Sequence, residues 1–291
     1  MKSRFGFWLL AMVSIQLNAQ TFTEKITKEF TVEKKSVDNA LVVANVNGNV
    51  TVVGYEGEMI VVEVTKSINA KTAARLEKGK NAIKLGVLDL ADTIILYVDG
   101  LCGGFGKQDR RNRGNHQGVS NWGYNWNNGC NDCNDGYDYK MDFVVRVPNS
   151  LNIVVSTINN GNLSVENVDG AVVAHNINGS IRLHNLKSAS DASTINGDVD
   201  VEYARNPQQD CRYYSLNGDI NAWFQRGLSA SMSFESFNGS FYTNIDRLEA
   251  LPAQVEKKNM EEGIKYKVNG NRYKVGSGGA NLDFETFNGN V

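Results

Sequence analysis

The chain has 291 residues, of which 41% are hydrophobic and 21% charged, and its formal net charge is −2. These values exclude a disordered tail, a collagen-like fibre and a nucleic-acid binder that relies on bulk positive charge. The sequence holds 36 Asn and 28 Gly against only 3 Pro. Because Asn and Gly tolerate left-handed backbone, this bias predicts many tight turns of one kind.

The N-terminus has the pattern of a secretory signal peptide. Lys2 and Arg4 precede an apolar run, Phe5–Val13, and Ala19 provides a small residue at the cleavage position. A bilayer span needs about 20 apolar residues, so this run is too short for a membrane anchor. We therefore expect residues 1–19 to be removed and the mature protein to be exported, to the periplasm, the cell surface or the medium, with no further membrane span.

Residues 20–99 are expected to form an N-terminal β region that contains one short helix. Helix formers without a β-branched run occupy residues 71–81. On either side of this helix we expect the strands Ile60–Val64 and Ile94–Val98, each at the edge of a sheet.

Residues 100–137 interrupt the β pattern as a long inserted loop. Between residues 100 and 136 this loop holds 9 Gly and 8 Asn. A structureless loop of this length is usually functional or disordered, and its aromatic residues favour function.

Three aromatic residues of the loop, Trp122, Tyr124 and Trp126, are spaced by two positions. In an extended segment they would face one side, where they could stack on a sugar ring while neighbouring Asn side chains bind its hydroxyls. Aromatic residues in loops also serve local packing.

A basic cluster precedes these aromatics and contains Arg110, Arg111 and Arg113. It could meet an acidic polysaccharide or lipid head groups, or it could form a solvated surface.

Three of the four cysteines lie in the same loop, at Cys102, Cys130 and Cys133, and the fourth is Cys211. With His116, the loop cysteines are the residue types that a tetrahedral zinc ion needs. An exported protein meets an oxidising compartment, so disulfides are favoured over zinc, and four cysteines allow three complete pairings. We expect no metal or other cofactor.

A calcium loop is also disfavoured. The segment from Asn131 to Gly136, with Asp142 after it, has the outline of such a loop, but Cys133 occupies the third ligand position.

Residues 138–291 contain a nine-residue period. Gly161, Gly170, Gly179 and Gly197 mark its start, and Ser188 fills the missing slot. Apolar residues recur two, four and seven positions after each start, with Ser190 as the one exception. They are Leu163, Val172, Ile181 and Val199; Val165, Ala174, Leu183, Ala192 and Val201; and Val168, Ile177, Leu186, Ile195 and Ala204.

The period predicts an all-β fold, a parallel β-solenoid of about 18-residue coils that each have two nine-residue halves. Positions +2 and +4 point to one side of a strand, and the Asn or Asp before each Gly is expected to make the corner. A series of β-hairpins is the alternative, but hairpins do not require a constant period. From Pro252 to Tyr273 we expect a hairpin excursion before the last coil.

The outward positions +3 and +5 should stack in two rows on neighbouring coils. The rows are Ser164, Arg182 and Asp200, and Glu166, His184 and Glu202. Alternating charge suits cross-strand pairing, and a structural face explains the rows as well as a catalytic site does.

Several turn-and-core motifs occur along nearly the whole mature chain. They are the segments Val46–Val50, Ile60–Val64, Val147–Ser150, Thr157–Leu163, Gly278–Ala280 and Thr286–Gly289. With these motifs the chain resembles the bacterial "putative adhesin" family DUF4097, which is related to the head GIN auto-transporter adhesin domains. The resemblance implies an exported β-solenoid with an adhesion role, and it supplies no catalytic residues.

We therefore expect a non-enzymatic, adhesin-like solenoid that binds a surface glycan or an envelope protein through the 100–136 loop, and not nucleic acid. One alternative is a polysaccharide-active enzyme that uses Arg182 or Glu166. Another is an envelope scaffold that associates end to end with copies of itself.

Overall fold

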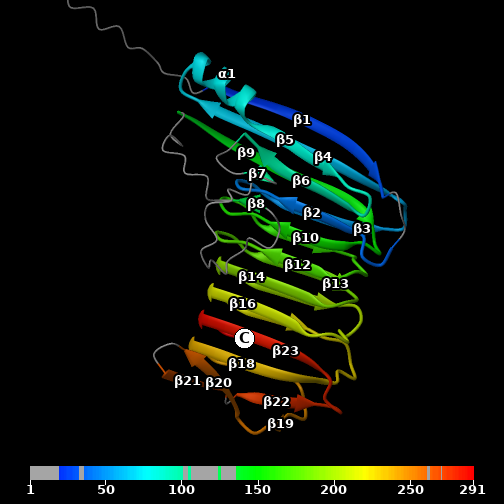
Figure 1. Ribbon diagram of the computed structural model, residues 1–291, viewed down its shortest axis with the longest axis vertical. Coiled ribbons are helices and arrows are strands. Elements are labelled where there is room, and N and C mark those ends of the chain that lie inside the picture. The colour runs from blue at the N-terminus through cyan, green and yellow to red at the C-terminus, as the bar shows by residue number, and fades with distance from the viewer. Residues whose placement is uncertain are drawn as a thin grey trace, which may run out of the picture.

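The computed structural model describes residues 20–32, 36–100, 104–105, 124–125, 136–260, 263–269 and 271–291. Two large β-sheets face each other along an elongated body, with a single described helix at the N-terminal end (Figure 1). The expected all-β class is confirmed. The predicted signal peptide, residues 1–19, lies outside the described residues.

The first sheet has eight strands. Strand β4 pairs antiparallel with both β1 and β9, and the strands from β9 to β17 pair parallel. In spatial order the strands are β1 (Gln20–Thr31), β4 (Met59–Ala70), β9 (Tyr137–Pro148), β3 (Val50–Tyr55), β11 (Leu163–Glu166), β13 (Ile181–Leu186), β15 (Val199–Tyr203) and β17 (Ile220–Trp223).

The second sheet has eleven strands. Those from β18 to β6 pair parallel, and both ends of the sheet are antiparallel. In spatial order the strands are β19 (Glu249–Ala250), β22 (Arg272–Val275), β18 (Ala230–Asn238), β23 (Ala280–Asn288), β16 (Cys211–Asn217), β14 (Ser190–Asn196), β12 (Val172–His175), β10 (Asn152–Ser156), β2 (Ala40–Ala44), β6 (Thr93–Asp99) and β5 (Lys84–Asp89).

Both sheets are therefore mixed, so the expectation of a purely parallel solenoid is not met. In the middle of the body, from β10 to β17, the chain does alternate between the two sheets. Leu163 pairs with Ile181 and Ile181 with Val199, which is the 18-residue spacing that the period predicted. The antiparallel pairs lie at the β1 end of the first sheet and at both ends of the second sheet.

The core lies between the two sheets. Positions +2 and +4 of the period point inward, as predicted, and side chains such as Leu163, Val165 and Val201 are fully buried. Because each coil places apolar residues above those of the coil before it, the core is one continuous column along the body.

One corner of each coil is built by a Ser/Thr/Asn-x-Asn-Gly motif. The first residue of the motif points inward and donates a hydrogen bond to the glycine carbonyl of the neighbouring coil. Thr194 donates to Gly179 at 2.9 Å and Ser215 to Gly197 at 2.8 Å. The same bond is made by Asn176, Thr286 and Ser236, and also by Thr157, whose segment has one more Asn before the glycine.

Glycine ends this motif because the coils approach closely there. A Cβ atom on Gly197 or Gly218 would clash with the glycine carbonyl one coil earlier. The Asn before the glycine forms a row of side-chain hydrogen bonds, from Asn196 to Asn178 at 2.8 Å and from Asn217 to Asn196 at 2.9 Å. The Asn and Gly residues of the coils are thus explained by stacking as well as by turn conformation.

Two details of the predicted corners are wrong. At this corner position +7 points outward, and Ile195 is 39% exposed, because the preceding Thr194 takes the inward position. At the opposite corner Val168 and Leu186 are buried as expected. There the left-handed residue is not the Asp before Gly170 but Asn167, with φ 60°, and Asn185 has the same role one coil on.

The predicted short helix is confirmed as α1 (Ala73–Ala82), which the Thr72 side chain caps. The edge positions predicted for the strands beside it are wrong. Strand β4 lies between β1 and β9, and β6 lies between β2 and β5, because β1 and β5 add further strands outside them.

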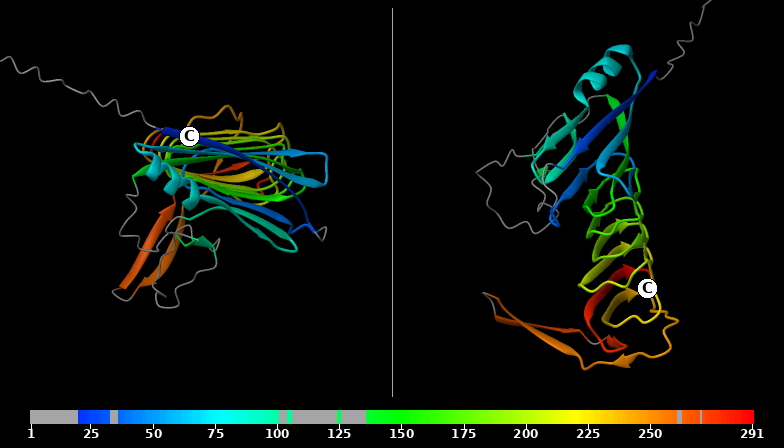
Figure 2. Two further views of the ribbon diagram at one scale, coloured as in Figure 1. Left: turned by 90° about the horizontal axis from the view of Figure 1, so that it is seen from above. Right: turned by 90° about the vertical axis from the view of Figure 1, so that its right-hand side faces the viewer.

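The C-terminal strand β23 inserts between β16 and β18, although both precede it in the sequence. The predicted excursion is confirmed as a hairpin of β20 (Gln254–Met260) and β21 (Gly263–Asn269). Figure 2 shows this hairpin projecting from the body. A second small pair joins β7 (Gly104–Phe105) and β8 (Tyr124–Asn125).

Candidate functional site

The outward surface of the first sheet carries the two predicted rows of side chains. Strand pairing places Ser164 beside Arg182 and Arg182 beside Asp200, and then Asp200 beside Asn221. The second row runs through Glu166, His184, Glu202 and Trp223. We call the last three strands of these rows the ladder face, which consists of Arg182, His184, Asp200, Glu202, Asn221 and Trp223.

Polar groups of the ladder face are paired between strands. His184 Nδ1 lies 2.7 Å from Glu202 Oε2, and Arg182 Nη2 lies 3.7 Å from Asp200 Oδ2. Asn221 Nδ2 donates to the other oxygen of Asp200 at 2.9 Å. These contacts join the side chains of neighbouring strands and leave them accessible, since the Arg182 and Glu202 side chains are 71% and 48% exposed.

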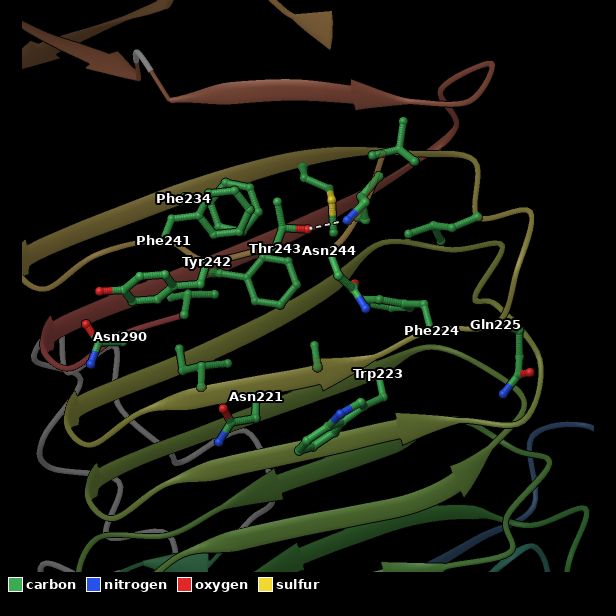
Figure 3. Close-up of a pocket in the computed structure, with 18 of the residues that line it drawn as sticks. Asn221, Trp223, Phe224, Gln225, Phe234, Phe241, Tyr242, Thr243, Asn244 and Asn290 are labelled. Atoms are coloured by element: carbon green, nitrogen blue, oxygen red, sulfur yellow. Dashed lines mark hydrogen bonds between the residues drawn. The ribbon is translucent and has the colours of Figure 1, made fainter. Parts of the chain in front are cut away.

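Trp223 ends the second row. Its side chain is 53% exposed, which is unusual for so large an apolar surface. It follows Glu202 in strand register and so ends the second row. Figure 3 shows its side chain on the same side of β17 as that of Asn221. A shallow hollow of about 360 Å³ is lined by Trp223, Arg182, Leu183, His184, Asp200 and Glu202.

This arrangement can bind a molecule that has both an apolar face and several hydroxyl groups. The indole offers a flat apolar surface. The carboxylates accept hydrogen bonds, and the guanidinium, imidazole and amide groups donate them. One guanidinium and two carboxylates line the hollow together with an imidazole, so groups of both signs face a ligand there.

A second titratable cluster is buried between the sheets, away from the ladder face. The hydroxyls of Tyr203 and Tyr213 lie 2.7 Å apart, and both contact Ser190 Oγ, at 2.7 and 2.9 Å. Burial raises the pKa of both phenols. Cys211 Sγ lies 3.3 Å from the Tyr203 hydroxyl. This cluster is closed to ligands and serves to satisfy polar groups inside the core.

Cys211 is a free, buried thiol. Cys211 therefore forms no disulfide, and the four cysteines are not all paired. The loop cysteines Cys102, Cys130 and Cys133 lie outside the described residues, so a disulfide within the loop stays a prediction. Within the ranges that the structure covers, no three His, Cys, Asp or Glu side chains are arranged to hold a metal ion.

The predicted binding residues of the loop are not placed by the structure. Tyr124 is part of β8, where it pairs with Phe105, and only its backbone is described. Outside the described residues lie Trp122, Trp126, Arg110, Arg111, Arg113 and the weak zinc candidate His116. The loop site therefore stays a prediction.

Sequence reasoning did not single out Trp223 as a site residue. It occupies position +5 after Gly218, in line with Glu202 and His184, and a continuation of the period by one coil would have placed it on this face. The insertion that lengthens the spacing from 18 to 21 residues hid this relation.

In the described part of the chain, no helix is long and apolar enough to cross a membrane. No known protein family has a model that matches the sequence, and no curated protein matches it either. Membership of DUF4097 therefore stays a prediction.

Two solved structures are similar to the chain. One is described as "a putative cell adhesion protein" from Clostridium sporogenes, with 10% identity, a TM-score of 0.39, and 93% of this chain and 98% of that chain covered. The other is "a putative adhesin" from Bacteroides fragilis, with 12% identity, a TM-score of 0.26, and coverage of 92% and 96%. TM-scores this low do not establish a shared fold, so any function must be argued from the residues of this chain.

Proposed function

We propose that the chain is an exported, non-enzymatic, adhesin-like protein that binds a neutral oligosaccharide on its ladder face. The observation that carries this proposal is the exposed indole of Trp223 at the end of a row of paired polar side chains. The signal peptide predicted at residues 1–19 supports export, which would bring the protein to the glycans of a cell surface or envelope.

A pyranose ring fits the chemistry of this surface. One face of the ring carries C–H groups, which pack on an aromatic plane, and its edge carries hydroxyls that need both donors and acceptors. Neighbouring strands are about 4.8 Å apart, a spacing close to the length of one sugar ring. Sugar units along an oligosaccharide can therefore contact Trp223 and then the side chains of successive strands.

The fixed geometry of the face also favours recognition. The carboxylates of Asp200 and Glu202 are already held by cross-strand contacts, so a ligand does not have to order them. Binding to a preorganised surface avoids part of the entropy cost of immobilising side chains. A rigid sheet supports this better than a long loop does.

The inserted loop is a second binding surface in this proposal. Its aromatic residues, Trp122, Tyr124 and Trp126, have the residue types that a sugar-binding loop needs. The two surfaces make different predictions, because substitutions in one should leave binding by the other intact.

The proposal is tested by binding of the mature protein to an array of neutral oligosaccharides. Trp223→Ala should weaken binding at least about tenfold, as expected when ring stacking contributes ~1.4 kcal/mol. Trp223→Phe should retain most of the binding because it keeps an aromatic plane. Phe237→Ala is the matched control, since Phe237 is 74% exposed but lies outside the ladder face.

Equal binding by the wild type and Trp223→Ala would refute a role for the ladder face. If binding were instead lost when Trp122, Tyr124 and Trp126 are replaced by alanine, the loop would be the site. The same oligosaccharides should remain intact during incubation. Shortened products that disappear in Glu166→Ala would support an enzyme and contradict the proposal.

A further inference from the structure

The corners of the coils contain pairs of asparagine and glycine, which are chemically labile. An asparagine before glycine is prone to lose its side-chain amide, because a glycine without a Cβ atom lets its backbone nitrogen approach the asparagine Cγ atom. The pairs with both residues in the described part of the chain begin at Asn47, Asn160, Asn178, Asn196, Asn217, Asn238 and Asn288. Their surroundings differ, so they should react at different rates.

Two kinds of hydrogen bond restrain most of these pairs. The asparagine side chain belongs to the Asn row, as in Asn196, whose Nδ2 donates to Asn178 Oδ1 at 2.8 Å. The glycine N–H donates to a backbone carbonyl of the neighbouring coil, from Gly197 to Asn217 O at 3.0 Å. Both restraints are present at Asn178, Asn196, Asn217 and Asn288, and one of the two at Asn47 and Asn238.

The pair at Asn160 has neither restraint. Its corner holds one residue more than the other corners, and the preceding Asn159 takes the place in the Asn row. Gly48 N–H likewise donates to the carbonyl of Asn159. Asn160 is therefore the extra residue, exposed and with φ 53°. Among the described residues, none is hydrogen-bonded to its side chain or to the N–H of Gly161.

This difference decides how easily the reacting atoms meet. The glycine nitrogen reaches Cγ only after rotation about the Cα–C bond of the asparagine, which turns the glycine N–H away from any partner. At Asn196 this rotation breaks the bond from Gly197, whereas at Asn160 there is no such bond to break. Gly161 is buried, so its unpaired N–H also disfavours the closed corner and makes local opening easier.

We propose that Asn160 is a site of spontaneous covalent modification, at which the side-chain amide is replaced by a carboxylate. The Gly161 nitrogen gives its proton to water and attacks Asn160 Cγ. The new C–N bond closes a five-membered ring, the Cγ–Nδ2 bond breaks, and ammonia leaves with a proton from water. A water molecule then opens the ring at either carbonyl, which gives aspartate or isoaspartate. The reaction is independent of carbohydrate binding.

Conversion to aspartate should leave the stacked coils intact, because Asn160 lies outside the Asn row. At Asn196 the same change would remove the Nδ2 donor that binds Asn178. The Asn160→Asp protein should therefore unfold at the same urea concentration as the wild type, and the Asn196→Asp protein at a lower one. Equal destabilisation by both substitutions would contradict the assignment of Asn160 as the unrestrained residue.

The proposal is tested by incubating the mature protein in mildly alkaline buffer and following each pair by mass spectrometry of tryptic peptides. Asn160 and Asn178 share the peptide 147–182, in which fragment ions separate them. In the folded protein Asn160 should react at least about tenfold faster than Asn178, Asn196, Asn217 and Asn288. A tenfold ratio corresponds to ~1.4 kcal/mol, about the net contribution of one hydrogen bond.

The same incubation in urea is the matched control, because it removes the hydrogen bonds and keeps the sequence. There the advantage of Asn160 should disappear. Asn160→Gln should abolish the fast reaction, since glutamine would have to form a six-membered ring, which closes far more slowly. The proposal is overturned if Asn160 reacts no faster than the restrained pairs in the folded protein. It is also overturned if its advantage persists in urea, because the local sequence would then select the site.

Discussion

Replacing Thr194 by valine removes one hydroxyl from a buried corner of the coil and leaves the shape of the side chain nearly unchanged. Thr194 is 1% exposed, and its hydroxyl donates to Gly179 O at 2.9 Å. Because the same contact recurs in the neighbouring coils, it is a repeated polar link between one coil and the next.

The expected loss follows from the carbonyl that remains. Valine cannot donate a hydrogen bond, so Gly179 O loses its side-chain partner in a region with little access to water. Leaving a buried acceptor without a partner costs about 1–3 kcal/mol. Since Gly179 itself is only half-buried, we expect a loss at the lower end, about 1–2 kcal/mol.

The free energy of unfolding is measured by urea denaturation, followed by far-UV circular dichroism and by tryptophan fluorescence. Thr27→Val is the matched control, because Thr27 lies exposed on β1 and the chemical change is the same. A surface substitution of this kind is expected to change the free energy of unfolding by less than about 0.5 kcal/mol. Thr194→Ser, which keeps the hydroxyl, should be less destabilising than Thr194→Val.

Equal destabilisation by Thr194→Val and Thr27→Val would refute this reasoning. So would a larger loss in Thr194→Ser than in Thr194→Val, since the missing methyl group would then matter more than the hydrogen bond.

Three further predictions concern buried or paired polar groups. Lys66 donates to Lys80 O and Ile83 O at the end of α1. Because Lys66→Met leaves these carbonyls without that donor, it should lower the free energy of unfolding by about 1–3 kcal/mol and accelerate hydrogen exchange in α1. Burial raises the pKa of Tyr213 in the folded protein. The stability that its protonated phenol contributes is therefore present below about pH 10, where the unfolded phenol begins to ionise, and is lost as the pH rises further. Stability measured between pH 8 and 11 should therefore fall less steeply in Tyr213→Phe than in the wild type. Hydrogen bonds from Asn281 lower the pKa of Asp210, so the stability lost in Asp210→Ala should be seen at neutral pH and should shrink as the pH falls below about 4.

The middle of the body could be predicted from the sequence because each position of the repeat meets the same surroundings in every coil. Leu163, Ile181 and Val199 all face one apolar column, so the pattern repeats wherever the surroundings do. The conformation of the corner was harder to predict, since Thr194 and Ile195 are both compatible with a strand. Which of them faces inward depends on a glycine carbonyl that lies one coil away.

The position of β23 could not be predicted from spacing. The motifs that begin at Ser215, Ser236 and Thr286 are equivalent in sequence and can stack in any order. In the structure the last of them lies between the other two, as the bonds of Asn288 with Asn217 and Asn238 show. Lengthening a flexible loop adds little closure entropy, so sequence distance does not decide which strands pair.

The candidate site was predicted in part. The rows through Arg182 and His184 follow from the 18-residue spacing, and their stacking is confirmed. Trp223 was missed because the coil that carries it is longer by an insertion. Residues of the inserted loop obey no period, so their placement could not be derived from the pattern that explains the rest.

The central claim is that Trp223 is the residue that contacts a carbohydrate. It is tested most directly by ¹⁹F NMR of the mature protein with 5-fluorotryptophan, in which Trp122, Trp126 and Trp223 give separate signals that are assigned by Trp→Phe variants. Cellopentaose, mannopentaose, laminaripentaose and chitopentaose are added in turn. We expect at least one of them to shift the signal that is missing in Trp223→Phe, whether or not the signals of Trp122 and Trp126 in the second surface also shift. Shifts confined to Trp122 and Trp126, or no shift with any of the four, would contradict the account.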